Sequence, residues 1–163
     1  MKHHLKSAAS FVLILSIVLS FLVSPSNASE LRNEDLQDVR LRYYSDGSYD
    51  VIMICQNDPG FYRAFTNGHV STSHYTSSNV LVWTVKLYGT FSYNGSSSNC
   101  VNAYTTVDFY ESGWSVLSES TGHSGNTAYN SVELGKKILG VTFTMEYLNQ
   151  SLSCDKDGNL SSP

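Results

Sequence analysis

Residues 81–93, with the sequence LVWTVKLYGTFSY, hold the pattern that decides the fold class of this chain. Apolar side chains occupy every second position from Leu81 to Leu87 and return at Phe91, with polar or amphipathic residues mostly between them. Successive side chains of a β-strand point to opposite faces of its sheet, so this alternation predicts a long strand with one apolar face. Gly89 interrupts the apolar series and predicts a bend in the strand.

Further strand-like segments follow toward the C-terminus. A turn rich in Ser and Asn at 94–99 leads into an alternating run at 101–109, and other apolar runs lie at 114–116, 128–134 and 139–147. No long helical period accompanies them, so the sequence predicts a single antiparallel β-sandwich, immunoglobulin-like in the broad sense. The predicted core residues are Leu81, Trp83, Val85, Leu87, Phe91, Val107, Phe109, Trp114, Val141, Phe143 and Met145.

The segments before this region are less regular. Charged and apolar residues mix at 29–42, which predicts an N-terminal arm or a short helix. The dipeptide Asp46-Gly47 predicts the turn of a β-hairpin over 43–55. Residues 56–79 are rich in hydroxyl side chains and contain Pro and Gly, which predicts a long irregular stretch that is either functional or partly ordered by its own strands.

The N-terminus has the features of a secretory signal peptide. Lys2 and Lys6 precede an apolar run of residues 11–23, and residues 26–28 (Ser-Asn-Ala) place small side chains where a signal peptidase cleaves. The run is shorter than the ~20 residues of a typical spanning helix, so we expect cleavage and a secreted, extracellular protein without membrane attachment. The expected domains are a signal peptide at 1–28, an N-terminal arm or short helix at 29–42 and a β-sandwich domain at 43–163.

The charge of the mature chain excludes some classes of partner. Removal of residues 1–28, which hold two of the 10 basic residues, leaves 8 basic and 14 acidic side chains, a net charge of −6 with neutral His. An acidic chain without a basic cluster does not suit nucleic acids or anionic membranes. All 11 tyrosines remain in the mature chain, and tyrosine suits half-buried sheet faces.

The mature chain also keeps all 3 cysteines, an odd number for an oxidising compartment. Cys100 opens one predicted strand and Cys154 closes the last one, each beside a polar turn, so we predict that these two form a disulfide. Cys55 ends the apolar run VIMI and is predicted to be a buried thiol. The sequence leaves the other pairings open.

Two short segments resemble parts of trypsin-like bacterial serine proteases. Residues 66–70 (TNGHV) resemble the histidine segment and residues 122–125 (GHSG) the nucleophile turn, with Asp108 between them. A triad would use His69 as base and Ser124 as nucleophile. Only 55 residues separate these two, too few for the two barrels that frame such a site, and no acidic residue precedes the serine. We therefore interpret both segments as polar turns and predict no catalytic residues.

The remaining candidate sites concern metals. Residues 155–159 (DKDGN) match the opening of a calcium-binding EF-hand loop, but the glycine stands too early and the final glutamate has no counterpart, so we interpret them as a polar turn. His69, His74 and His123 lack a spacing typical of zinc ligands, and no neighbouring Cys or carboxylate completes a set. We predict neither a metal nor a cofactor.

One longer pattern, within about residues 85–160, consists of 85–95 (VKLYGTFSYNG), Cys100, 114–116 (WSV), 124–128 (SGNTA) and 152–161 (LSCDKDGNLS). It resembles a recurrent pattern in small uncharacterised secreted proteins of Gram-positive bacteria. The resemblance implies a β-rich exported domain in which Cys100 and Cys154 are paired, and it carries no known activity.

We expect a non-catalytic extracellular binding or interaction module, whose partner is an unknown protein or glycan. Tyr88, Tyr104 and Tyr110 lie on the strand faces opposite the predicted core, and tyrosine makes contacts at low entropic cost. The simpler alternative is that these tyrosines cover the outer face of a Tyr-rich sheet or pack against the N-terminal segment.

The alternative function is a small secreted hydrolase that uses the 56–79 loop with His69 and Ser124. Clustering of His69, His74, Asp58 and Ser124 around one pocket would favour this enzyme. A flat exposed tyrosine patch would favour binding.

Overall fold

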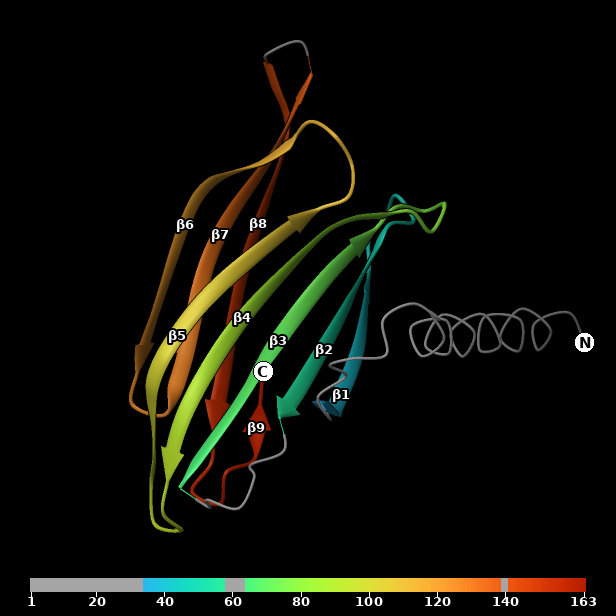
Figure 1. The fold of residues 1–163 in the computed structure, drawn as a ribbon. Coiled ribbons are helices and arrows are strands. Elements are labelled where there is room, and N and C mark those ends of the chain that lie inside the picture. Colours follow the sequence, from blue (N-terminus) through green and yellow to red (C-terminus); the bar gives the residue numbers. More distant parts are fainter. Residues whose placement is uncertain (1–33, 58–63, 139–140) are drawn as a thin grey trace, which may run out of the picture. The chain divides into compact units, whose positions relative to one another are not determined.

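The computed structural model describes residues 34–57, 64–138 and 141–163 (Figure 1). Regular structure within these ranges consists of β-strands, and no helix there is long and apolar enough to cross a membrane. The predicted signal peptide lies outside the described residues.

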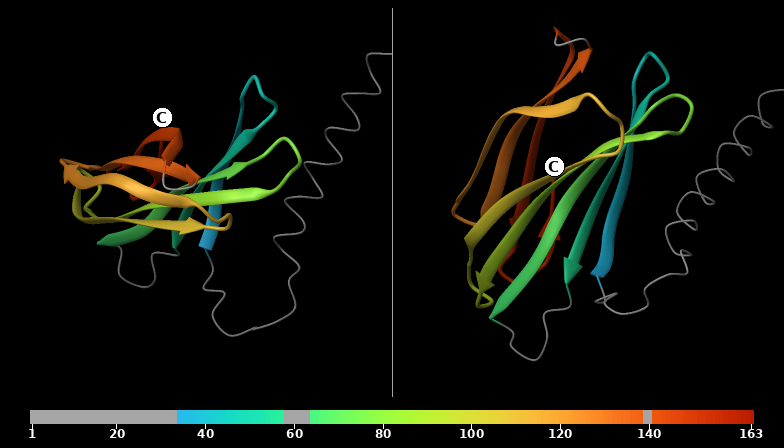
Figure 2. Two further views of the ribbon diagram at one scale, coloured as in Figure 1. Left: turned by 90° about the horizontal axis from the view of Figure 1, so that it is seen from above. Right: turned by 45° about the horizontal axis from the view of Figure 1, so that its top comes forward.

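The described strands form two antiparallel sheets, which confirms the predicted β-sandwich. The five-stranded sheet has the order β1-β2-β3-β4-β5, and the four-stranded sheet has the order β6-β7-β8-β9 (Figures 1 and 2). Within each sheet, strands that are consecutive in the chain are paired, whereas β5 and β6 belong to different sheets. The likeness to an immunoglobulin domain therefore lies in the two-sheet architecture and not in the strand order. The strands are β1 (Glu34–Tyr43), β2 (Tyr49–Asn57), β3 (Phe65–Tyr75), β4 (Leu81–Tyr93), β5 (Ser98–Phe109), β6 (Trp114–Ser124), β7 (Thr127–Ile138), β8 (Val141–Cys154) and β9 (Leu160–Ser161).

Strand β4 follows the alternation of its sequence. Val85, Leu87 and Phe91 are fully buried on the face turned toward the four-stranded sheet, which we call the inner face. The predicted irregularity occurs beside Gly89, because the register with β5 shifts between Thr90 and Phe91. A Cβ atom on Gly89 would lie 2.5 Å from a ring carbon of Phe91, so glycine leaves the space that the buried ring occupies.

Two groups of buried side chains from both sheets form the core. The cysteine cluster consists of Ile54, Val70, Leu87, Phe91, Cys100, Ala128, Leu152, Cys154 and Leu160. The tryptophan cluster consists of Val82, Trp83, Val85, Val132, Leu134 and Leu148. The core predictions for Trp83, Val85, Leu87 and Phe91 are confirmed, and the partly exposed Val107, Phe109 and Trp114 pack against the tryptophan cluster.

Other core predictions differ from the structure. Leu81 is only partly buried, and the side chain of Phe143 lies outside the described residues. The predictions for Val141 and Met145 are wrong, because these side chains are 57% and 52% exposed. Val141 pairs with Ile138 at the tip of the β7–β8 hairpin, beyond Lys136, the last residue of β7 that pairs with β6. Met145 pairs with Gly135 and lies on the face of β8 opposite to that of the buried Leu148 and Leu152.

The N-terminal segment forms an edge strand. Residues 34–43 are β1, so the helix alternative at 29–42 is wrong for these residues, where the N-terminal arm is a strand, and residues 29–33 lie outside the described ranges. The predicted hairpin over 43–55 is confirmed. Its turn places Gly47 at φ +84°, and the Asp46 carboxylate accepts the backbone N–H of Ser48.

The predicted loop at 56–79 contains the central strand of the five-stranded sheet. Residues 65–75 form β3, which pairs with β2 and β4, so the stretch is partly ordered by a strand of its own, and residues 58–63 lie outside the described ranges. An alternating apolar pattern does not reveal this strand, because its inner face carries Thr72 and His74 beside Val70. Its other face carries Ser71 and Ser73 between His69 and Tyr75.

Candidate functional site

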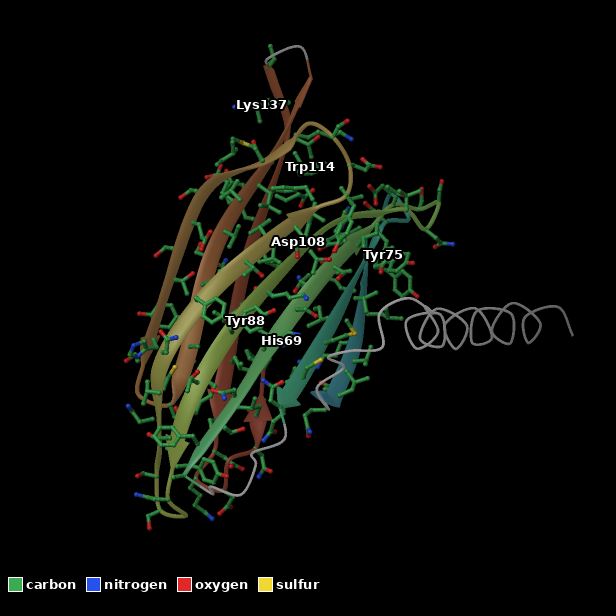
Figure 3. All side chains as sticks on the ribbon, viewed as in Figure 1. His69, Tyr75, Tyr88, Asp108, Trp114 and Lys137 are labelled. Carbon is green, nitrogen blue, oxygen red and sulfur yellow. The ribbon has the colours of Figure 1, made fainter. Side chains whose placement is uncertain are left out.

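The face of the five-stranded sheet turned away from the four-stranded sheet, which we call the outer face, carries a row of aromatic rings (Figure 3). Register places His69 of β3 beside Tyr88 of β4, and Tyr88 beside Tyr104 of β5. The ring centroids of His69 and Tyr88 lie 4.9 Å apart, and those of Tyr88 and Tyr104 lie 4.6 Å apart with an interplanar angle of 7°. We call these three residues the first aromatic row.

A second aromatic row crosses β1, β2 and β3 on the same face. Tyr43, Tyr49 and Tyr75 are cross-strand neighbours, with centroid distances of 5.7 Å and 5.1 Å. Burial raises the pKa of Tyr75, and the charges of Tyr49 and Tyr110 act in the same direction, which places Tyr110 near this row. His69 and Tyr75 are six positions apart on one strand, so the two rows are separated by about 20 Å.

Between the rows, β3 and β4 carry short hydroxyl side chains, which are buried, and β2 carries Val51 and Met53. Ser73 and Thr84 share a hydrogen bond of 2.9 Å, and the buried hydroxyl of Ser71 has no hydrogen-bond partner. Lys86 and the exposed Asp108 lie on the same side of β4 and β5 and carry opposite charges. The outer face of β3–β5 therefore combines aromatic rings and hydroxyls with little net charge.

The structure places the tyrosines of the predicted binding surface on this face. Tyr104 is 50% exposed and Tyr110 is 58% exposed, whereas Tyr88 is partly buried in the first aromatic row. Sequence reasoning missed the contribution of His69 and Tyr75, because both were assigned to a loop. The alternation of Ser71 and Ser73 with larger residues is the signal that marks this strand.

A polar pocket of about 290 Å³ lies at the β1–β2 turn and is lined by Tyr44, Ser45, Asp46, Ser48, His74 and Glu146. Behind it, the Asp50 side chain is only 2% exposed. Its carboxylate accepts a hydrogen bond of 2.5 Å from the Tyr44 hydroxyl and lies 2.8 Å from Nδ1 of His74. The His74 ring stacks on Trp83 with centroids 5.1 Å apart. These contacts fix the orientation of the histidine.

The carboxyl and histidine side chains in and behind this pocket are those of Asp46, Asp50, His74 and Glu146. Asp50 favours a proton on Nδ1 of His74, which is the arrangement that a histidine base requires. Within the described residues, however, no hydroxyl or thiol nucleophile hydrogen-bonds to His74. Burial raises the pKa of Glu146, His74 opposes this shift, and the carboxylates of Asp50 and Asp46 add to it.

A second pocket, of about 360 Å³, opens between the sheets beside the C-terminal residues. Its polar wall is a buried network, in which the side-chain amides of Asn130 and Gln150 hydrogen-bond at 2.9 Å. Gln150 also donates to the hydroxyl of Thr72 at 3.0 Å, which joins β8 to β3. Because these polar groups satisfy each other's hydrogen bonds, they can be buried where the two sheets pack together.

The residues of the hydrolase alternative are not brought together. His69 contacts Tyr88 on the outer face of β3, whereas Ser124 is exposed at the end of β6 in the other sheet. His74 lies on the inner face near the opposite end of β3 and is bound to Asp50. Asp58 lies outside the described residues. The triad partner Asp108 is on β5, paired with Thr84.

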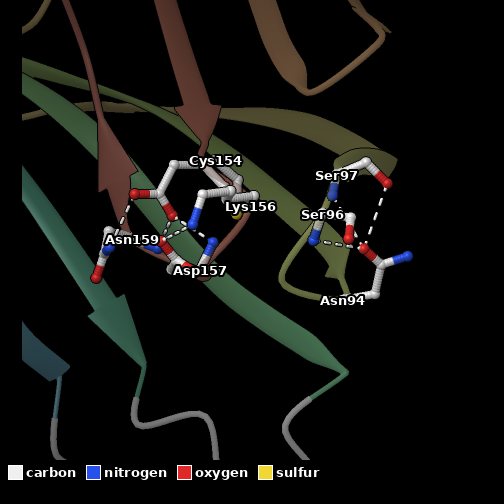
Figure 4. A network of polar contacts seen from close by, with 8 residues as sticks. Asn94, Ser96, Ser97, Cys154, Lys156, Asp157 and Asn159 are labelled. Atoms are coloured by element: carbon white, nitrogen blue, oxygen red, sulfur yellow. Dashed lines mark hydrogen bonds and ion pairs between the residues drawn. The ribbon is translucent and has the colours of Figure 1, made fainter.

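No group of three or more His, Cys, Asp or Glu side chains in the described ranges is arranged to hold a metal ion. The Asp155 carboxylate accepts the backbone N–H groups of Asp157 and Asn159 at 2.9 Å, and it also accepts the Asn159 side-chain amide (Figure 4). These bonds lower the pKa of Asp155. Residues 155–159 are therefore the polar turn that the sequence predicts, and His123 is exposed on β6.

The predicted disulfide partners lie in one cluster. Cys100 and Cys154 both belong to the cysteine cluster and are 1% and 0% exposed, and in the structure they carry thiols. Cys55 is also buried, as predicted, but is not part of that cluster.

Comparisons with known proteins give no relative for this chain: no family model, curated protein or solved structure matches it. The resemblance to Gram-positive secreted proteins therefore stays a prediction.

Proposed function

We propose that this protein is a secreted, non-catalytic binding module that holds a neutral glycan chain on the outer face of its five-stranded sheet. The observation that carries the proposal is the first aromatic row, which runs across β3, β4 and β5 without a break. In the second aromatic row Tyr43 is 61% exposed and offers a further contact on the same face, whereas Tyr49 and Tyr75 are buried.

The chemistry of the face favours a glycan over a protein partner. Sugar rings present C–H groups that pack on electron-rich aromatic faces, and hydroxyls that exchange hydrogen bonds with Ser, Thr and Tyr. On the outer face the half-exposed Tyr104 offers its ring, whereas Ser73 and Thr84 are buried and hydrogen-bonded to each other.

Charge restricts the glycan to a neutral one. Lys86 and Asp108 offset each other on this face, and the mature chain is acidic overall. An anionic polysaccharide would need a basic patch to offset its own charge. A neutral polymer needs only ring stacking and hydrogen bonds.

Secretion is part of the proposal and rests on the signal-peptide features of residues 1–28. The extracellular compartment is oxidising, so it would also allow the disulfide that the sequence predicts. Protein recovered from the medium of cells that express the full chain should begin at Ser29, and its intact mass tests this cleavage.

The binding experiment incubates this secreted protein with insoluble cellulose, chitin, xylan and starch and measures the bound fraction. We expect retention on at least one polymer, and a loss of roughly tenfold or more in affinity for Tyr104→Ala, as for an aromatic hot spot. Tyr147→Ala is the matched control, because Tyr147 is exposed on the four-stranded sheet. Failure to bind any of the polymers, or an equal loss in both variants, would overturn the proposal.

A further inference from the structure

Cys100 and Cys154 are distant in sequence but are held at the same place by their backbones. The N–H of Cys100 donates to the carbonyl of Gly125 at 2.8 Å, and the N–H of Cys154 donates to the carbonyl of Asn126 at 3.0 Å. Because Gly125 and Asn126 are consecutive residues of the β6–β7 turn, both cysteines are anchored to one short piece of chain.

The two side chains share one apolar environment. Both thiols lie in the cysteine cluster and are shielded from water, and each donates to a nearby carbonyl at 3.3 Å, Cys100 to Asn102 and Cys154 to Asp155. Burial raises the pKa of Cys154 to about 11, and the charges of Asp155 and Cys100 add to the shift. The two sulfur groups are therefore within electrostatic reach of each other.

Cys55 occupies a different side of the five-stranded sheet. Its neighbour Ile54 points into the cysteine cluster, so alternation along β2 directs Cys55 to the outer face. Its cross-strand neighbours are Leu36 on β1 and His69 on β3. A bond from Cys55 to either of the other cysteines would have to pass through the sheet.

We infer that Cys100 and Cys154 are the partners of a disulfide that joins β5 of the five-stranded sheet to β8 of the four-stranded sheet. The inference depends on the proposed extracellular location only for its oxidant and is independent of glycan binding.

The oxidant is a small-molecule disulfide such as oxidised glutathione. The thiolate of one cysteine attacks it to form a mixed disulfide and releases one reduced glutathione. The thiolate of the second cysteine then attacks the mixed disulfide, which forms the Sγ–Sγ bond and releases a second reduced glutathione. The protein loses two protons and two electrons, and glutathione gains them.

The burial of both thiols determines when the bond forms. The thiolate is the reactive species, and a pKa of about 11 for Cys154 leaves little of it at neutral pH in the folded chain. Oxidation is therefore fastest before the sheets close, and the folded dithiol form should react slowly.

The test uses the secreted protein, unfolded and reduced, then refolded with a mixture of reduced and oxidised glutathione. Remaining thiols are alkylated in denaturant, and a non-reducing digest is mapped by mass spectrometry. We expect one crosslinked peptide pair that contains Cys100 and Cys154 and lacks the mass of two hydrogen atoms, with alkylated Cys55. Alkylation of all three cysteines, or a crosslink to Cys55, would overturn the inference.

Two variants show which cysteines pair even if they fold poorly, because the peptide mapping by mass spectrometry does not require a folded protein. Cys55→Ala should keep the crosslink, and Cys154→Ala should lose it without a new bond between Cys55 and Cys100. A second arm adds oxidised glutathione to reduced protein that has already folded, and we expect crosslinking at least roughly tenfold slower than during refolding. Equal rates would contradict the role of burial. A crosslinked protein that binds no polysaccharide would refute only the proposed function.

Discussion

The inner and outer faces of the five-stranded sheet differ in how their side chains are covered. Leu87 and Phe91 on the inner face are fully buried against the four-stranded sheet, whereas Tyr104 on the outer face keeps 50% of its surface exposed. Leu87 and Tyr88 are adjacent in the chain, yet one belongs to the core and the other to the first aromatic row. Stability and the proposed glycan recognition therefore use opposite faces of the same strands. A mutation on one face should change one of these two properties and leave the other nearly unchanged.

The largest effect on the free energy of unfolding is expected for Phe91→Ala, which removes a core ring from the inner face. Removal of this fully buried ring should lower the free energy of unfolding by about 3–5 kcal/mol, because burial is lost and a cavity remains. Urea unfolding monitored by circular dichroism measures the change. Tyr104→Ala is the outer-face counterpart, with an expected loss below about 1.5 kcal/mol. A larger loss for Tyr104→Ala than for Phe91→Ala would remove the distinction between the faces.

The next effect concerns the covalent link from the inner face to the second sheet. The double variant Cys100→Ala/Cys154→Ala should lower the free energy of unfolding by roughly 2–4 kcal/mol relative to oxidised wild type. A reducing agent should destabilise wild type and Cys55→Ala but leave the double variant unchanged. Insensitivity of wild type to reduction would mean that the link contributes nothing to stability.

The smallest effect is a pH dependence of the free energy of unfolding. It originates at the polar pocket beside the β1–β2 turn, which we call the Asp50–His74 pocket. Burial of the ring and the hydrogen bond to Asp50 raise the pKa of Tyr44 from 10.0 to about 12. The folded state then holds this proton more tightly than the unfolded state, so the stabilisation is complete below pH 10 and is lost as the pH rises toward 12.

Tyr44→Phe isolates this contribution from that of other tyrosines. Unfolding free energies of the two proteins, measured at intervals across this alkaline range, should converge as the pH rises. The difference between them should be constant below pH 10. Parallel curves at all pH values would show that the Tyr44 hydroxyl does not titrate differently in the folded protein.

Sequence reasoning succeeds where one face of a strand is purely apolar. The alternation in 81–93 predicts β4, its inner-face core residues and the irregularity near Gly89, because a two-residue period has one structural reading. Asp46-Gly47 predicts the first hairpin for a similar local reason, the φ of +84° that Gly47 adopts.

The same reasoning fails where polar side chains are buried or apolar ones exposed. Strand β3 hides Thr72 and His74 in hydrogen bonds to Gln150 and Asp50, partners that lie far away in the chain and cannot be seen locally. Met145 lies in an apolar run, but it is on the face of β8 opposite to that of the buried Leu148, so it is exposed. The aromatic rows depend on the register of β3, so sequence alone found only part of them.

The most direct test of the account records the ring-proton NMR signals of isotope-labelled protein during titration with soluble cello-, chito-, xylo- and malto-oligosaccharides. We predict that one of these sugars shifts the ring signals of Tyr88 and Tyr104 and leaves those of the inner-face Phe91 unchanged. If no sugar shifts the outer-face rings, or if a sugar shifts only signals of the Asp50–His74 pocket, the outer face is not the glycan-binding surface.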